Sequence, residues 1–96
     1  EQITLSFTEN EINGNAGINN YSGTYKISND NISIQGIGAT EMAGPDNLMR
    51  IEGEYLALLE NVKKIKLINQ KTLVLTTDKG KTLTFEKWKM KYWSWY

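Results

Sequence analysis

Residues 40–62 read TEMAGPDNLMRIEGEYLALLENV, and in this stretch the spacing of the apolar residues changes from that of a strand to that of a helix. Pro45 cannot lie inside a helix, and Asp46 directly after it is a suitable N-cap. Gly53 destabilises a helix by about 1 kcal/mol. The stretch still predicts one amphipathic α-helix over about residues 46–60. Its apolar stripe, with spacings of three, four and seven, consists of Leu48, Ile51, Tyr55, Leu58, Leu59 and Val62.

Segments in which apolar and polar residues alternate lie on both sides of this predicted helix. Such alternation is typical of a strand with one buried face. Polar turns separate the segments at residues 28–31, 69–71 and 78–80. The predicted strands are residues 3–8, 12–18, 21–27 and 32–36 before the helix, and residues 65–67, 72–76 and 83–85 after it. Hairpins, one helix and further hairpins predict a mainly β fold of the α+β class, in a single domain spanning residues 1–96.

The C-terminal segment is rich in aromatic residues that alternate with lysines. The apolar residues stand at odd positions up to Phe85 and at even positions from Trp88, so we expect a bulge or bend at residues 86–87. One interpretation is a last strand whose rings close the core. The other is a binding surface for a glycan or peptide, formed by Trp88, Tyr92, Trp93 and Trp95. A platform for single-stranded nucleic acid is disfavoured because the net charge is zero.

Composition argues against the common classes of enzyme. The 96 residues include no cysteine and no histidine, which excludes disulfides, thiolate nucleophiles and a Ser-His-Asp triad. We therefore predict no catalytic residues, no cofactor and no metal site. Residues 1–60 carry nine acids and two bases, whereas residues 61–96 carry nine lysines and two acids. We expect the two halves to fold against each other; the alternative is a basic face used for binding.

Four short motifs have both a chemical and a structural interpretation. Residues 36–41 resemble the start of a dinucleotide fingerprint but lack its third glycine, so a strand bend is favoured. Glu52 and Glu54 are two apart, and such positions on a helix point in different directions, so solvated charges are favoured over an acid–base pair. Residues 29–31 are favoured as a hairpin turn over a calcium loop. Residues 19–23 are favoured as a tight turn over an amide surface for sugars or peptides.

Several segments in fixed order resemble a known family. They are ITLSF at residues 3–7, GNAGINNYSGTY at 14–25, IGATEMAGP at 37–45, EGEYLALL at 52–59 and LVLT at 73–76. Together they resemble the META domain, also called the HslJ-like heat-shock family, over about residues 3–85. The resemblance implies structural roles for the motif residues Gly17, Asn19, Tyr21, Ser22, Gly23, Tyr25, Thr40, Met42, Ala43 and Pro45.

The resemblance carries expectations about fold and function. It implies a small, antiparallel, barrel-like curved sheet with one packed helix. It also implies a bacterial cell-envelope protein, exported to the periplasm or lipid-anchored at a membrane, with links to heat shock and antibiotic tolerance. We therefore expect a non-catalytic domain with a protein or glycan partner, no nucleic acid, and membrane contact only through an upstream lipid anchor. The alternative is a glycan- or peptide-binding module that uses the aromatic C-terminal segment.

This chain departs from the family pattern in two respects. Relatives often carry cysteine at the positions of Ile18 and Gly44, so a thiol role at these positions does not apply here. The family pattern also opens with a Trp-containing strand that this sequence lacks. We hypothesise that residues 88–96 occupy the equivalent edge of the sheet.

Overall fold

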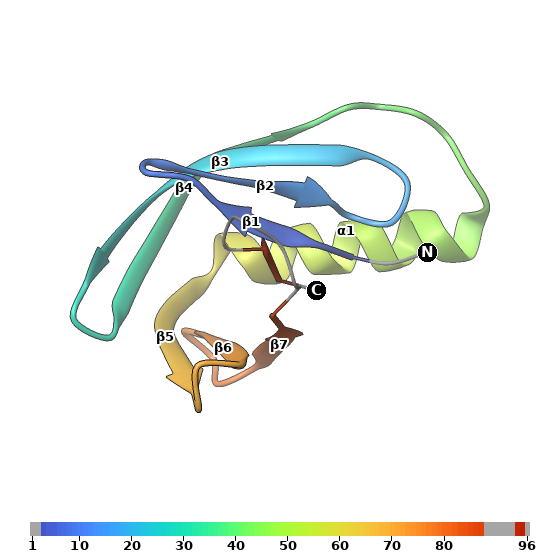
Figure 1. The fold of residues 1–96 in the computed structure, drawn as a ribbon. Helices are drawn as coiled ribbons and strands as arrows, with labels where there is room; N and C mark the ends of the chain where they lie inside the picture. The colour runs from blue at the N-terminus through green and yellow to red at the C-terminus, as the bar shows by residue number, and fades with distance from the viewer. Residues whose placement is uncertain (1–2, 88–93, 96) are drawn as a thin grey trace.

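The computed structural model describes residues 3–87, 94 and 95 of the chain. It contains one antiparallel sheet with the strand order β7-β6-β5-β4-β3-β2-β1-β8, and one helix (Figure 1). The strands are β1 (Leu5–Phe7), β2 (Glu11–Asn15), β3 (Asn20–Ser28), β4 (Asn31–Ala39), β5 (Val62–Ile68), β6 (Thr72–Thr77), β7 (Thr82–Glu86) and β8 (Ser94–Trp95), and the helix is α1 (Asp46–Glu60). The predicted fold class, a mainly β barrel-like sheet with one helix, is confirmed.

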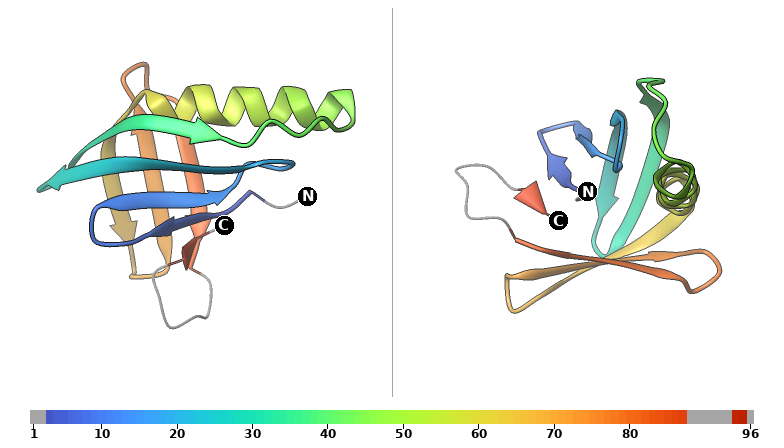
Figure 2. Two further views of the ribbon diagram at one scale, coloured as in Figure 1. Left: turned by 90° about the horizontal axis from the view of Figure 1, so that it is seen from above. Right: turned by 90° about the vertical axis from the view of Figure 1, so that its right-hand side faces the viewer.

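The sheet folds over between β4 and β5. These strands share a single residue pair, Asn31 with Lys64, whereas β3 and β4 pair along most of their length. Strands β1 to β4 therefore form one layer and β5 to β7 another, and the two layers cross at a steep angle (Figure 2). At the other end of the strand order, β8 pairs with β1 at Leu5 and Ser6. We hypothesised that the C-terminal segment occupies the sheet edge beside the first strand, and β8 lies at that edge. Residues 88–93 of the segment lie outside the described residues.

The core fills the space between the layers and the helix. Leu5, Ile12, Leu59, Val62 and Leu75 are its largest fully buried side chains. Tyr55 of α1 packs edge-on against Tyr21 of β3 and Phe85 of β7, with ring centroids 5.5 and 6.3 Å apart. One helical residue thus contacts both layers.

The helix has the predicted bounds, but its cap and its buried face differ from the prediction. Pro45, not Asp46, is the N-cap, and its carbonyl oxygen accepts hydrogen bonds from the N–H groups of Leu48 and Met49. No side chain caps this end, because Asp46 is already the first helical residue. The buried face consists of Glu52, Tyr55 and Leu59, whereas Ile51 of the predicted stripe is 41% exposed. The face is therefore rotated relative to the apolar stripe.

The predicted turns are present at the expected places. Asn29, Asn69 and Gln70 have positive φ, as does Gly80 in the turn before β7. The bend predicted near residue 36 occurs at Gly36, where φ is 64° and the pairing of β3 with β4 shifts register. Strand β2 ends at Asn15, earlier than predicted, because the Asn15 side chain accepts a hydrogen bond from Gly17 N–H in a turn.

Gly14 allows two strands to approach each other closely. A Cβ atom at this position would lie 2.1 Å from the carbonyl oxygen of Thr4. That same oxygen accepts the hydroxyl of Tyr21 at 2.6 Å. The backbone at Thr4 therefore cannot move away without breaking a buried contact.

We predict that Gly14→Ala destabilises the domain by about 1–3 kcal/mol, the usual cost of overpacking. The measurement is urea unfolding followed by circular dichroism. Gly38→Ala is the matched control, because a Cβ at Gly38 meets no atom within 4 Å. The packing argument is wrong if both variants unfold at the same urea concentration.

Candidate functional site

Asn19 lies at the centre of a buried polar network. Its side-chain Nδ2 donates to the Met42 carbonyl at 3.0 Å and to Glu52 Oε1 at 2.7 Å. Its Oδ1 accepts from Thr40 Oγ1 and from Met42 N–H, both at 2.7 Å. Every donor and acceptor of this amide is used. The turn before β3, the segment after β4 and the helix α1 are thereby joined at one side chain.

Glu52 is the helical partner in this network. Its Oε2 accepts hydrogen bonds from the N–H groups of Ile18 and Asn19 at 3.0 and 2.7 Å. Burial raises the pKa of the Glu52 carboxyl, but the hydrogen bonds from the Asn19 side chain and from the two backbone N–H groups outweigh burial and leave the pKa below its usual value. The prediction that Glu52 is a solvated helix charge is wrong, because its side chain is buried. Its carboxylate accepts the hydrogen bonds of backbone N–H groups that pair with no neighbouring strand. Glu54 is exposed, as predicted.

We predict that Glu52→Gln lowers the free energy of unfolding at pH 7 by about 1–3 kcal/mol, the usual cost of leaving buried donors without acceptors. Because the folded-state pKa is lowered, the ionised form stabilises the fold above the unfolded-state pKa, and this contribution is lost as the pH falls through the folded-state pKa. The difference between wild type and variant should therefore shrink in acid. Urea titrations across this pH range measure it, and Glu54→Gln is the control that should change little.

Two buried tyrosine hydroxyls form a second polar contact next to the network. Tyr21 donates to the Thr4 carbonyl at 2.6 Å, so its oxygen accepts the proton of Tyr55, also at 2.6 Å. Burial raises the pKa of both hydroxyls far above the usual value for tyrosine. They stay protonated at any physiological pH and cannot serve as bases. This pair binds the helix to the first strand.

The other motif residues lie around the same region. Gly17 has a φ of 121° in the turn that carries Asn19, and Pro45 begins the helix. Gly23 faces Gln35 and Ile37 of β4, whereas the side chains of Ser22, Met42 and Ala43 are exposed. Tyr25, farther along β3, donates its hydroxyl to the Thr8 carbonyl at 2.6 Å and packs edge-on against Phe7. The motif thus connects segments that are far apart in the sequence.

Ile18 and Gly44 are in direct contact. A Cβ added at Gly44 would lie 2.5, 3.1 and 3.6 Å from Cδ1, Cγ1 and Cγ2 of Ile18. Since Cγ1 and Cγ2 are both bonded to Cβ, the two Cβ positions fall within the roughly 3.5–4.5 Å separation of disulfides. A side chain at position 44 would therefore require the end of the Ile18 side chain to move.

We predict that the double variant Ile18→Cys and Gly44→Cys forms a disulfide when oxidised. In the chain-entropy view, a bridge that closes a loop of this length stabilises a protein by about 3–4 kcal/mol. Thermal unfolding with and without a reductant measures the gain, and each single variant is a control that should not respond to reductant. Free thiols in the oxidised double variant would contradict the geometry.

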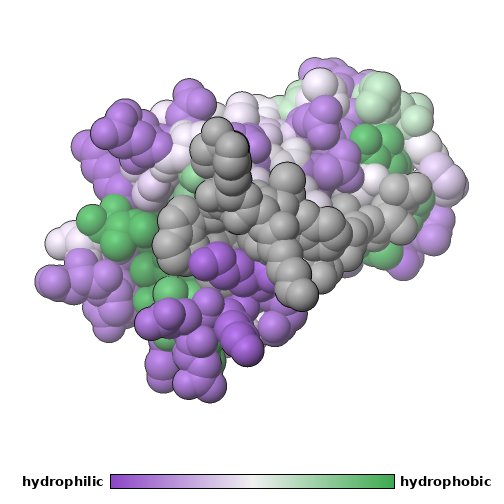
Figure 3. Space-filling view, in the orientation of Figure 1, coloured by the Kyte–Doolittle hydropathy of each residue, from purple (hydrophilic) through white to green (hydrophobic). Residues whose placement is uncertain are grey.

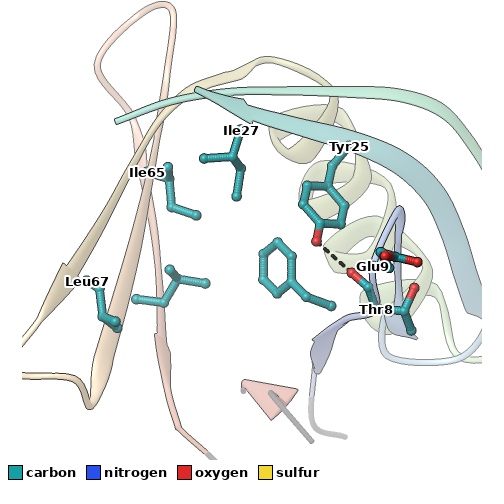
Figure 4. A pocket seen from close by; sticks show the side chains of 8 residues that line it. Thr8, Glu9, Tyr25, Ile27, Ile65 and Leu67 are labelled. Carbon is teal, nitrogen blue, oxygen red and sulfur yellow. Dashed lines mark hydrogen bonds between the residues drawn. The ribbon is translucent and has the colours of Figure 1, made fainter. Parts of the chain in front are cut away.

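A separate, apolar cavity opens at one end of the barrel. Its volume is about 510 Å³, and it lies between β3, the β1–β2 turn and the β5–β6 hairpin (Figure 4). Glu9 is the one charged side chain among its described lining residues, which are Phe7, Thr8, Glu9, Tyr25, Ile27, Ile65, Leu67 and Leu73. The alternating sequence pattern predicts strands at these apolar positions, but no pattern in the sequence indicates the cavity.

The cavity wall is incompletely covered. Ile27 and Leu67 point into the opening in Figure 4, yet their side chains are 45% and 43% exposed. Ile68, next to Leu67, is also exposed. Figure 3 shows a patch of apolar surface with hydrophilic surface around it. The patch lies on the left side of the molecule, near the tip of the β3–β4 hairpin and the end of β5. The interior of the barrel is therefore open to solvent at this end, within the part of the chain that the structure describes.

The residues predicted as an aromatic binding surface are mostly untested. Trp88, Tyr92 and Trp93 lie outside the described residues, and the backbone of Trp95 pairs with that of Leu5. Among residues 3–87, 94 and 95, no three acidic side chains gather where they could hold a metal ion, and no helix is long and apolar enough to cross a membrane.

Comparison with known proteins identifies the family. The sequence model of the META domain family matches residues 1–89 of this chain. The chain belongs to the META domain family. The predicted family is thereby confirmed, and the network around Asn19 joins the two motifs that indicated it, GxNxYSGxY at residues 17–25 and TxMAxP at residues 40–45.

Two solved structures resemble this META domain. One is an NMR structure of a protein from Burkholderia xenovorans, with 29% sequence identity and a TM-score of 0.69, which matches 83% of this chain and 57% of that one. The other, also an NMR structure, has 29% identity and a TM-score of 0.64, and the match covers 85% of this chain and 69% of that one. This chain thus spans just over half of the Burkholderia protein's length. No curated protein matches the sequence.

Proposed function

We propose that this META domain is a non-catalytic binding module that takes an apolar group into the cavity at the open end of its barrel. The observation that carries this proposal is the cavity itself, about 510 Å³ in volume and lined largely by apolar side chains. Ligand pockets in proteins typically measure about 300–1,000 Å³. Barrels of about eight strands are wide enough to hold one small ligand.

The exposure of the cavity wall supplies a driving force for binding. Fully burying a leucine or isoleucine side chain contributes about 1.5–3 kcal/mol. Ile27 and Leu67 are both less than six-tenths buried, so an apolar occupant gains part of that free energy from each. The aromatic pair of Phe7 and Tyr25 gives the opposite wall a fixed shape, because Tyr25 is also hydrogen-bonded to Thr8.

The described polar groups support binding without catalysis. Glu52 has both carboxylate oxygens occupied by hydrogen bonds, and Tyr21 and Tyr55 keep their protons. The sequence contains no histidine or cysteine that would supply a base or nucleophile near neutral pH. Binding and structural support are the roles that this set of groups favours.

We also propose that the domain acts in the bacterial cell envelope, as an exported or lipid-anchored protein, under heat or antibiotic stress. This proposal is supported by the family resemblance alone. Cell fractionation of the natural full-length protein tests the compartment. Recovery in the cytoplasmic fraction would contradict it.

We predict that the neutral apolar dye N-phenyl-1-naphthylamine binds in the cavity and gains fluorescence there. Ile27→Gln and Leu67→Gln place an amide in the wall and should each weaken dye binding by about tenfold, which corresponds to about 1.4 kcal/mol. Both side chains are half-exposed, so stability should change little.

Ile51→Gln is the matched control, because Ile51 is 41% exposed on α1 and does not line the cavity. Its dye affinity should equal that of wild type. Equal affinities in all three variants, or no dye binding by the folded wild type, would overturn the proposal.

A further inference from the structure

The cavity is bordered by a strand edge that lacks a partner among the described residues. Ile65 N–H points away from β6 and donates to the Asp30 carbonyl at 2.9 Å. Since N–H groups alternate sides along a strand, Leu67 N–H points the same way. The pairing of β4 with β5 is limited to Asn31 and Lys64, so within the described chain no strand reaches Leu67 on that side.

The side chains along this edge alternate in character. Ile65 and Leu67 face the cavity, directly opposite Leu75 and Leu73 of β6. Lys64 and Lys66 occupy the intervening positions, so they face the outside of the barrel. Because Lys64 is already paired with Asn31 of β4, a strand added at Leu67 would place the side chain opposite Leu67 in the cavity and a neighbouring side chain beside Lys66.

We propose that the β5 edge at Leu67 binds an extended segment of a partner protein as an additional antiparallel strand, with apolar side chains entering the cavity and acidic side chains lying beside Lys66. This proposal rests on the proposed function and names its partner as a peptide with alternating apolar and acidic residues. Three observations carry it: the backbone at Leu67, which no described strand pairs with on this side, the adjoining apolar cavity, and Lys66 on the outer face. Addition of a strand to an open edge is an established mode of peptide recognition.

The test uses synthetic peptides and the folded domain. The probe is a short N-acetylated, C-amidated peptide of alternating valine and glutamate. In antiparallel pairing, the residue opposite Leu67 both exchanges hydrogen bonds with it and points into the cavity, so valine N–H groups face β5. N-methylation at the valines should therefore weaken binding by about tenfold or more, because these hydrogen bonds are lost. N-methylation at the glutamates is the matched control and should leave the affinity nearly unchanged.

Charge is tested separately. Lys66→Glu should weaken binding of the glutamate peptide and strengthen binding of a peptide of alternating valine and lysine. Lys79→Glu, at the opposite end of β6, is the control with the same change of charge and should alter neither affinity. NMR titration reports affinity together with shifts at Ile65–Ile68 and Ile27, and circular dichroism verifies that each variant is folded.

The outcomes separate this inference from the proposed function. If the dye enters the cavity but the peptide does not bind, or binds equally well with N-methyl valines, the strand-addition proposal is wrong and the proposed function stands. If neither binds, both are wrong. If Leu67 N–H is already protected from exchange in the free protein and shows contacts with residues 88–93, the chain covers its own edge and the proposal is also wrong.

Discussion

The hydrogen bonds between Glu52 and the turn at Ile18 and Asn19 determine how the helix sits on the sheet. A carboxylate buried in a small protein costs free energy unless its oxygens are satisfied, and here three N–H groups satisfy them. Two of these N–H groups belong to the backbone of Ile18 and Asn19, in the loop between β2 and β3, and the third belongs to the Asn19 side chain. In this loop the backbone groups have no neighbouring strand to pair with. Each side of the contact therefore removes the other's desolvation penalty. Asn19 extends the contact to Thr40 and Met42, so the segment that leads into the helix is fixed by the same group.

This arrangement explains why the motif residues are far apart in sequence yet act together. Tyr55 lies one turn after Glu52 on the same face of α1 and reaches Tyr21, which follows Asn19 by two residues. The helix thus contacts the turn before β3 through a carboxylate–amide contact and β3 itself through a hydroxyl–hydroxyl contact. Residues that bear hydroxyls and carboxylates are used here as structural links. The polar groups of Glu52, Tyr21 and Tyr55 are all hydrogen-bonded within the fold.

Much of the architecture followed from the sequence, and the exceptions have identifiable physical causes. Periodicity predicted the bounds of α1 and the alternation of the strands, because both patterns report which residues leave water. It failed at Glu52, because a buried carboxylate on an otherwise apolar face depends on donors more than thirty residues away. It also failed at the cavity. Ile27 and Leu67 have the alternating pattern of core residues, yet both side chains are partly exposed, because burial there depends on how the two layers pack and not on the alternation within each strand.

The same fold-over that completes the core creates the opening. One residue pair joins β4 to β5, so the layers separate beyond it and the barrel is filled near the helix but not at the far end. The polar network and the tyrosine pair lie where α1 meets the sheet, whereas the open end contains the exposed side chains of Ile27 and Leu67 beside the strand edge. The contacts that hold α1 in place and the apolar cavity therefore lie in different parts of one barrel. In a domain built in this way, residues at the open end can change without disturbing the contacts that hold α1 in place.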